Sequence, residues 1–555
     1  MSLPNFSTQS ELFSTAGLSV SLFTETDRYR LFARLVYPCL TQARSQLESC
    51  YCLDNGRSAV EPVLLLGVSL LQYLEAIPDR QAVDLLKYHA GWNFALNRQI
   101  GDELFHSTTL VNFRQRLLEH DLSALAFQTV LEALIQAGLV ARQSRQRLDS
   151  TQMFGRVSRM SRLDCIRESL RLALQELEPL IESPARPAYW AEFWERYVES
   201  QVDLRASTET LTRKLVQAGQ DAYQLLDWLQ AGSQAQWLEG PQVQLLTRVF
   251  SEQFETVGES ALPQPRAKED LDSARVYNPH EPEAAYASKG HGSHRKDHIG
   301  YKVQVAETVS EASLAMGEPT RNFLAGITTH AAQESDHAGA QRMQAEQTAM
   351  GLEKPTVQYV DTAYISGQQL VMAAAEGREL IGPAPGPGDN GGLFTTDRFT
   401  VNVEQRKAIC PAGHLQTQCS RSTREQNGKV SFRFAWTSHC ANCGLRQQCI
   451  EPRKIFRQVI VSEHHTALQT RRQEQHTDAF RQRMKHRTAI EGTQSELVRA
   501  HGLRRARYRG LAKAKLQNYF IGAACNTKRW IRREVWKLKL AASAASAQRA
   551  NSTAN

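Results

Sequence analysis

The stretch Gly300-Tyr-Lys-Val-Gln-Val-Ala306 alternates apolar and polar side chains, which is typical of a β-strand with one buried face. The residues from Phe323 to Thr329 predict a second strand, those from Ser335 to Met350 a helix, and those from Thr356 to Asp361 a third strand. The order strand, strand, helix, strand favours an α/β fold, with antiparallel pairing early and a crossover connection later.

Helical patterns dominate the sequence before this region. From Asp27 to about Gly138 apolar residues recur at helical spacing, so residues 1–145 are predicted to form an all-helical N-terminal domain. Arg147-Leu-Asp149-Ser-Thr is a short candidate strand that ends in a carboxylate, and we place the first core strand in residues 146–160. Residues 161–297 are then predicted to be a helical insertion followed by a linker rich in proline and charge.

Within the N-terminal domain, the residues from His106 to Arg116 resemble a capped helix start followed by a basic, polar-faced helix. A helix-turn-helix DNA reader needs such a helix. An ordinary helical bundle with solvated arginines explains the same pattern.

The second half of the chain divides into four parts. Residues 298–382 form the middle of the α/β core, and residues 383–462 carry β-like runs at Phe399–Val403, Val430–Trp436 and Phe456–Val461, which predict a separable β insertion. Helical patterns resume in residues 463–540. The Ala- and Ser-rich residues 541–555 are predicted to be disordered.

The bulk properties indicate a soluble, cytoplasmic protein. At 555 residues the chain is long enough for two to four domains, and its net charge of +8 is concentrated between Arg487 and Lys539. The N-terminus begins Met1-Ser-Leu-Pro-Asn5, with no cationic segment leading into an apolar one. The longest apolar run, Val63–Leu71, is about half of the ~20 residues that span a bilayer, so no membrane partner is expected.

Three acids occupy positions that metal-assisted phosphoryl chemistry needs. Asp149 and Asp361 end predicted strands, and Glu491 lies in a segment crowded with arginine and lysine. Mg²⁺ prefers carboxylate oxygens, and two such ions can activate the attacking oxygen and stabilise the leaving one. Each acid also has a simpler explanation, because Asp149 and Asp361 can cap helices and Glu491 can pair with Arg487 one helical turn away.

Together these motifs resemble bacterial insertion-sequence transposases of the DDE class, in particular the group numbered eleven eighty-two. The resemblance extends from the helical N-terminal domain nearly to the tail. It rests on Leu148-Asp149-Ser-Thr, Gly300-Tyr-Lys-Val, Tyr359-Val-Asp361-Thr-Ala-Tyr364, Arg487-Thr-Ala-Ile-Glu491-Gly and Gly502-Leu-Arg-Arg-Ala-Arg-Tyr-Arg-Gly-Leu-Ala-Lys513.

The resemblance implies a split RNase H-like catalytic core in which Asp149, Asp361 and Glu491 match the metal-binding triad. It implies catalytic Mg²⁺ or Mn²⁺, with Arg487 orienting Glu491 or touching phosphate. In the wider superfamily a tyrosine precedes this arginine by three residues and a lysine follows the glutamate by seven, but this chain has Met484 and Val498 there. The residue that contacts the terminal phosphate is therefore open, with Arg499, Arg504 and Arg505 as candidates.

The function that the resemblance implies is DNA transposition. The enzyme would bind the terminal inverted repeats of an insertion sequence, cut phosphodiester bonds with two metal ions and join the 3′ ends to target DNA, acting as a homo-oligomer, at least a dimer, on double-stranded DNA. The alternatives are an inactive DNA-binding protein of the same ancestry and a nuclease without strand transfer.

The basic residues after Glu491 are candidate contacts to the DNA backbone, although a charge run is often only a solvated face. These candidates are Arg499, Arg504, Arg505, Arg507, Arg509, Lys513 and Lys515.

Cysteines cluster in the predicted β insertion. Cys410, Cys440, Cys443 and Cys449 have a spacing that fits a tetrahedral thiolate site for structural Zn²⁺. Reduced, buried cysteines are the competing interpretation, and Cys419, His414 or His439 can substitute as ligands. The other cysteines are expected in hydrophobic cores.

Overall fold

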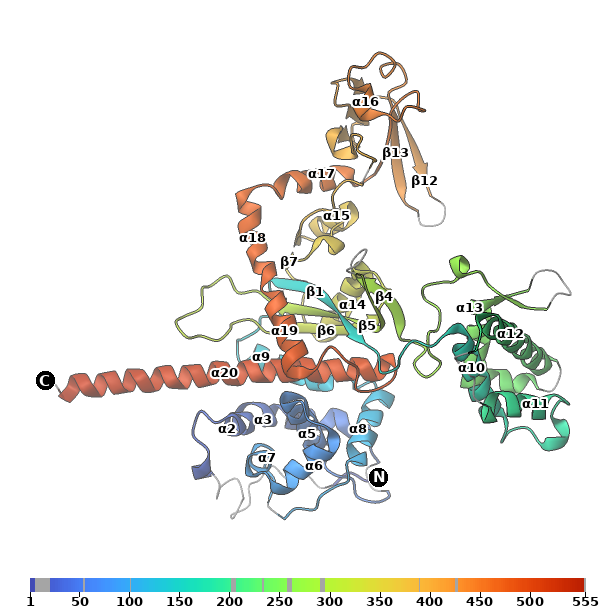
Figure 1. The fold of residues 1–555 in the computed structure, drawn as a ribbon. Coiled ribbons are helices and arrows are strands. Elements are labelled where there is room, and N and C mark those ends of the chain that lie inside the picture. Colours follow the sequence, from blue (N-terminus) through green and yellow to red (C-terminus); the bar gives the residue numbers. More distant parts are fainter. Residues whose placement is uncertain are drawn as a thin grey trace.

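A mixed β-sheet lies at the centre of the molecule, with helices around it (Figure 1). The computed structural model describes residues 1–4, 20–52, 55–99, 101–200, 206–231, 234–256, 262–289, 295–388, 390–424 and 428–553. Six strands of this described part form the sheet: β1 (Gln146–Phe154), β4 (Ala285–Lys289), β5 (Lys296–Thr308), β6 (Leu324–Ala331), β7 (Val357–Tyr359) and β8 (Glu379–Ile381). They run in the order β4-β5-β1-β7-β8, and β6 pairs with the part of β5 that β4 leaves open.

The sheet changes direction at β1. This strand pairs antiparallel with β5 on one side and parallel with β7 on the other, and β7 pairs parallel with β8. The stretch 300–306 lies in the middle of β5, and α14 (Asp336–Ala349) and α15 (Gly367–Ala375) supply the crossovers to β7 and β8. The predicted α/β class is confirmed.

The N-terminal helices share one hydrophobic core with the sheet. They are α2 (Arg28–Leu31), α3 (Tyr37–Gln42), α4 (Arg44–Glu48), α5 (Pro62–Glu75), α6 (Asp79–Tyr88), α7 (Ala90–Ala95), α8 (Thr108–Glu119) and α9 (Leu125–Gln136). The long helix α20 (Leu511–Thr553) passes between them and the sheet, as Figure 1 shows. Buried side chains of α5, α9, α20, β5 and β6 belong to one continuous cluster. The N-terminal helices are thus packed against α20 and the sheet and do not form a separate domain joined to them only by a linker.

A glycine allows the close approach of α20. A Cβ added at Gly522 would lie 2.8 Å from Ile327 of β6 and 2.9 Å from the ring of Phe127 of α9. Any larger residue there must push the two layers apart.

The helical insertion has a core of its own. It follows β1 and contains α10 (Arg162–Leu177), α11 (Trp190–Trp194), α12 (Thr208–Gln230) and α13 (Pro241–Gln253). Their buried side chains form a separate cluster, which includes the aromatic residues Trp190, Phe193 and Tyr197. The linker expected before β5 contains β4, and its residues 290–294 lie outside the described part of the chain.

The β insertion is a second separate body, at the top of Figure 1. Its strands are β9 (Thr400–Asn402), β10 (Lys407–Ile409), β11 (Leu415–Gln416), β12 (Cys419–Thr423), β13 (Val430–Ala435) and β14 (Gln458–Ser462). The sequence indicated β9, β13 and β14 and missed the other three, which have only two to five residues each.

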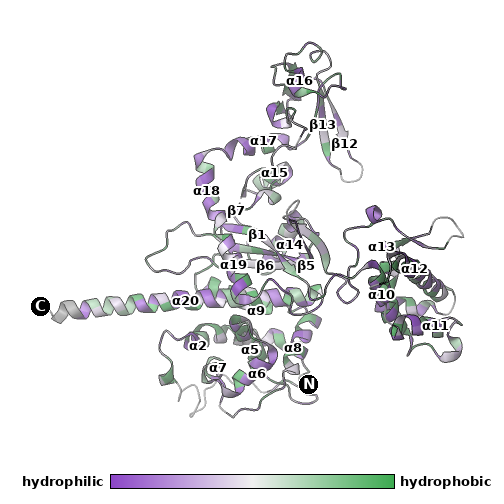
Figure 2. Cartoon of the chain, in the orientation of Figure 1, coloured by the Kyte–Doolittle hydropathy of each residue, from purple (hydrophilic) through white to green (hydrophobic). Residues whose placement is uncertain are grey.

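Helices α17 (His465–Glu474), α18 (Asp478–Thr488) and α19 (Ile490–His501) return the chain from the β insertion to the sheet. Figure 2 shows that α17 and α18 are mostly hydrophilic, whereas α5 is strongly hydrophobic. No helix of the described residues is long and apolar enough to cross a membrane. Residues 541–553 continue α20 as a helix, so the prediction of disorder there is wrong for these residues.

Candidate active site

Asp149 lies in the middle of β1, and the prediction that it ends the strand is wrong. β1 continues to Phe154 because its second half pairs with β5 from Val305 to Gly300. Asp149 is 8% exposed. A helix-capping role is therefore excluded for this residue.

Asp361 follows β7 by two residues. Because β1 and β7 run parallel with Arg147 opposite Tyr359, their register places Asp361 beside Asp149. One oxygen, Oδ1, accepts a hydrogen bond from the backbone N–H of Ala363 at 2.8 Å, so Asp361 also caps a short helical turn. The capping explanation is thus correct for Asp361, while its side chain remains 38% exposed.

Glu491 and Arg487 come from the junction of two helices. Arg487 lies in the last turn of α18 and Glu491 in the first turn of α19. The Glu491 side chain is 66% exposed, and that of Arg487 is 20% exposed.

The guanidinium of Arg487 lies among all three acids. Its Nη2 is 3.2 Å from Oδ2 of Asp149 and 3.8 Å from Oδ2 of Asp361, and its Nη1 is 3.6 Å from Oε1 of Glu491. Three carboxylates that are far apart in the sequence therefore meet around one cation. Without a positive charge between them they would repel one another.

Two neutral groups lie close in sequence to residues of the site, Tyr364 after Asp361 and His486 before Arg487. Burial raises the pKa of the Tyr364 phenol well above its usual value, so it stays protonated beside Asp149 and Asp361. Burial and the neighbouring Arg147 lower the pKa of His486. The positive charge nearest to the acids at neutral pH is therefore that of arginine.

A buried ion network holds the strand and the helix of the site together. Glu307 of β5 is 1% exposed, and its Oε2 accepts from Nε of Arg147 at 2.6 Å. Its carboxylate also accepts from the hydroxyl of Thr493 at 2.9 Å and from Nη1 of Arg529 at 2.5 Å. Arg147 lies two residues before Asp149, and Thr493 lies two residues after Glu491.

Sequence reasoning missed this network. One available signal was the alternation of β1, which puts Arg147 on the same face as Asp149. Arg529 belongs to the basic last helix, but it is 6% exposed and pairs with Glu307 and Glu496. Arg533 of the same helix pairs with Glu318 at 2.6 Å.

The basic residues after Glu491 fall into two groups. Arg499, Arg504, Arg505, Arg509 and Lys513 are exposed. By contrast, Lys515 pairs with Glu346 at 2.7 Å, and the Arg507 guanidinium donates to the carbonyl of Ile77 and covers the Tyr73 ring. These last two side chains are engaged within the protein.

Arg504 contacts β1, the strand that carries Asp149. Its Nη1 donates to the carbonyl of Gln152 at 3.1 Å, and its own carbonyl accepts from the N–H of Phe154 at 2.9 Å. The segment after α19 is thereby fixed to the end of β1.

The two positions that depart from the superfamily signature pack inward. Met484 contacts the small apolar cluster around Tyr359, and Val498 contacts the main core. Neither is placed to contact a phosphate.

The segment with the helix-turn-helix pattern forms α8, where Arg114 is buried. Its guanidinium binds Asp79 of α6 at 2.5 and 3.1 Å, which leaves it unavailable for reading DNA. Trp436 of the β insertion is 1% exposed and packs against Phe399, so its ring is not available to stack on a base.

Another cluster of possible metal ligands is more closely spaced than the three acids, but its chemistry does not suit a metal ion. Among the described residues, Glu496, His501 and Cys525 form the group of possible ligands that all lie within 4.8 Å of one another. Glu496 already pairs with Lys528 and Arg529, and burial raises the pKa of Cys525 to about 12. Two cations and a protonated thiol make this a structural cluster.

Two segments match models of protein families. Residues 409–531, which include Arg487 and Glu491, match a transposase DDE domain. Residues 20–116, in the N-terminal helices, match a transposase domain described as DUF772. No curated protein matches the chain. The two family matches point to a DDE transposase of an insertion sequence.

Proposed function

We propose that this protein is a DNA transposase of the group numbered eleven eighty-two. It binds the terminal inverted repeats of its element, cleaves phosphodiester bonds there and joins the freed 3′ ends to target DNA. The single observation that carries this proposal is the convergence of Asp149, Asp361 and Glu491 around Arg487.

The strand arrangement supports an RNase H-like core. The order β6-β5-β1-β7-β8, antiparallel up to β1 and parallel after it, brings the first two acids side by side on neighbouring strands. The helical insertion splits this core after β1, and the β insertion splits it before α17.

The three acids fit divalent Mg²⁺ or Mn²⁺. Their oxygens already surround a positive group, and carboxylate oxygen is the donor that these ions prefer. Asp361 and Glu491 are also partly exposed, so the site is open to solvent and substrate. The chemistry that such ions supply when bound is activation of the attacking oxygen and stabilisation of the leaving one.

The protein residues position the DNA and each other. The Glu307 network fixes β1 against α19 and so sets the separation of Asp149 and Glu491. Arg487 exchanges its carboxylate partners for the scissile phosphate. Arg504, anchored to β1, supplies the phosphate contact that Val498 cannot make.

The exposed basic residues Arg499, Arg505, Arg509 and Lys513 track the DNA backbone beside the acids. Because transposition joins two ends, the active form is a homo-oligomer, at least a dimer, on double-stranded DNA.

The experiment is cleavage of DNA that carries the ends of the element, with and without Mg²⁺. The parent protein should give Mg²⁺-dependent cuts at the ends and joined products with target DNA. Asp149→Asn, Asp361→Asn and Glu491→Gln should each lower cleavage by at least about a hundredfold, because each removes an oxygen ligand needed in the transition state. If the substituted proteins cut as well as the parent, the triad assignment is wrong.

Two further outcomes separate the alternatives. Cuts without joined products would indicate a nuclease without strand transfer, and end binding without cuts would indicate an inactive DNA-binding relative.

In a binding assay, Arg509→Ala and Lys513→Ala should each reduce the slope of log K against log salt by about 0.9. The matched control is Lys354→Ala, which removes a half-exposed lysine paired with Glu376 and should leave the slope unchanged.

A further inference from the structure

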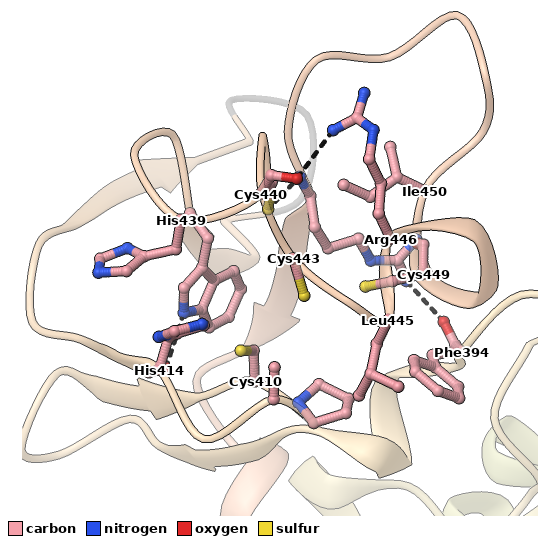
Figure 3. A pocket seen from close by; sticks show the side chains of 14 residues that line it. Phe394, Cys410, His414, His439, Cys440, Cys443, Leu445, Arg446, Cys449 and Ile450 are labelled. Carbon is pink, nitrogen blue, oxygen red and sulfur yellow. Dashed lines mark hydrogen bonds between the residues drawn. The ribbon is translucent and has the colours of Figure 1, made fainter.

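Four thiols of the β insertion lie around one small pocket. Cys410 follows β10, Cys440 and Cys443 lie in the loop after β13, and Cys449 ends the short helix α16 (Arg446–Cys449). Figure 3 shows the sulfur atoms of Cys410, Cys443 and Cys449 turned toward one another, with Cys440 beside them. All ten cysteines lie in the described part of the chain, and none forms a disulfide.

Tight turns present two of these thiols. After Cys410, the N–H of Gly413 donates to the Cys410 carbonyl at 2.8 Å, and the N–H of Cys410 donates to the carbonyl of His414 at 3.1 Å. Gly413 has φ of +84°, a conformation that favours glycine. After Cys443, the N–H of Arg446 donates to its carbonyl at 3.1 Å. Cys410 and Cys443 are thus each the first residue of a hydrogen-bonded turn.

Two arginines brace the loops and bring positive charge to the thiols. Arg446 donates to the carbonyls of Cys440, Lys454 and Ile455, and Arg457 donates to the carbonyls of Cys449 and Phe394. The backbone N–H of Arg457 also donates to Sγ of Cys440 at 3.4 Å. Arg446 and Arg457 thus fix the backbone at Cys440 and Cys449.

The β insertion has little else to hold it together. Its core is a separate cluster of twelve buried residues, and three of its six strands have only two or three residues. Small bodies of this kind usually need a disulfide or a metal for stability. A disulfide is absent from the described residues, which leaves the thiols for a metal.

We propose that Cys410, Cys440, Cys443 and Cys449 bind one structural Zn²⁺ as four thiolates. Binding releases the thiol protons and joins β10, the loop after β13 and α16 at one point. Zn–S bonds are about 2.3 Å long, so the sulfur atoms must approach one another more closely than in this structure, where the four do not all lie within 4.8 Å. Four protein ligands fill the tetrahedral coordination shell, as in structural zinc centres, whereas catalytic zinc centres keep one position open.

Of the other candidate ligands, the two histidines, His414 and His439, line the same pocket as the four cysteines. Cys419 lies on β12 and does not line the pocket. His439 points away from the sulfur atoms in Figure 3, and its ring is tilted against that of His414, with the two centroids 4.6 Å apart.

The test is the zinc content of the purified full-length protein, measured by plasma mass spectrometry. We expect one zinc per chain in the parent and in Cys419→Ser, the matched control. Cys440→Ser and Cys443→Ser should each lower the content at least fivefold. A parent that stays without zinc after refolding in Zn²⁺, or a Cys419→Ser protein that loses it, overturns the proposal.

A second measurement does not depend on variants that fail to fold. The parent protein loaded with Co²⁺ should show the absorption of a tetrahedral four-thiolate site, and His414→Ala and His439→Ala should leave that spectrum unchanged. A changed spectrum in either histidine variant overturns the four-cysteine assignment. The result is independent of the proposed DNA chemistry, because neither measurement uses DNA.

Discussion

At the scale of single residues, Arg487 is the feature that most constrains the site. One guanidinium lies within 4 Å of three carboxylates from β1, from the segment after β7 and from α19. A cation at that position offsets the repulsion among the acids and competes with any divalent ion for them. Arg487 is therefore expected to oppose metal binding in the free protein while being needed for cleavage.

Replacing Arg487 with alanine tests this competition. We expect Arg487→Ala to bind Mn²⁺ about tenfold more tightly, since about 1.4 kcal/mol is a modest share of the interaction between charges at this separation. Cleavage should nevertheless become slower, because the phosphate loses its contact. Mn²⁺ affinity is measured by titration calorimetry.

The control is Arg483→Ala, one helical turn earlier in α18. Arg483 pairs with Glu379 of β8 at 2.5 Å and contacts none of the three acids in the ion pairs of the described residues. Its replacement should leave Mn²⁺ affinity unchanged. Weaker or equal Mn²⁺ binding by Arg487→Ala would show that the arginine supports the site instead of competing with the metal.

The second residue-scale prediction concerns Glu307. Glu307→Gln leaves Arg147 and Arg529 buried without their shared negative charge, and breaking such a pair costs about 3 to 5 kcal/mol. Urea unfolding should therefore show a large loss of stability. Glu311→Gln removes the partner of Arg145 at an exposed site and should cost less than about 1 kcal/mol. Equal losses of stability in the two variants would mean that the buried network stabilises the fold no more than an exposed ion pair does.

At the scale of elements, the sequence predicted the strongly patterned segments and missed several short strands. β5 was recognised from the alternation of its residues 300–306, whereas β10 and β11, with three and two residues, were not recognised. Strands this short carry no periodicity and are fixed by their neighbours. Asp149 was wrongly expected to end its strand, because the second half of β1 depends on pairing with β5, a contact between distant segments.

The candidate site was predictable as a set of residue types but not as a geometry. Asp149, Asp361 and Glu491 were recognised from motifs, yet their meeting around Arg487 depends on the parallel register of β1 and β7. Arg529 illustrates the opposite failure. A basic residue on a charged helix usually faces solvent, and only the tertiary position of Glu307 explains why Arg529 is buried.

A prediction at this scale concerns the passage of α20 between α9 and β6. Gly522→Ala puts a methyl group 2.8 Å from Ile327, and we expect a net loss of about 1 to 2 kcal/mol, because the overpacking exceeds the gain in helix propensity. Gly492 of α19 has no atom within 4 Å of the added Cβ, so Gly492→Ala should stabilise the protein slightly. Thermal unfolding measures both, and a stabilised Gly522→Ala protein would contradict the close packing.

At the scale of the whole molecule, the three largest hydrophobic clusters of the described residues divide the chain differently from the domains predicted from the sequence. The N-terminal helices, expected as a separate domain, share their core with the sheet and α20. The helical and β insertions have cores of their own. Composition and periodicity do not show whether helices share a core with a sheet or form a core among themselves, because the helices bury an apolar face in both cases.

Because the helical insertion has a hydrophobic core of its own, we predict that it can be removed without unfolding the rest of the protein. Its ends meet at a narrow neck, where the N–H of Met160 donates to the carbonyl of Tyr277 at 3.1 Å and Asn278 Nδ2 donates to the carbonyl of Ser158 at 2.9 Å. A short Gly-Ser linker in place of residues 161–276 can therefore span the neck. The shortened protein should fold and keep its Mn²⁺ affinity, since the ion pairs of the acids come from β1, α18 and α19.

Removing the N-terminal helices should have the opposite effect. A protein without residues 1–140 exposes the apolar face of α20 that now packs against α5 and α9, and we expect it to aggregate. Circular dichroism and size-exclusion chromatography of the two deletion proteins compare these outcomes directly. If the protein without 161–276 aggregates, or the one without 1–140 stays folded and monodisperse, then stability follows some division of the chain other than its hydrophobic cores.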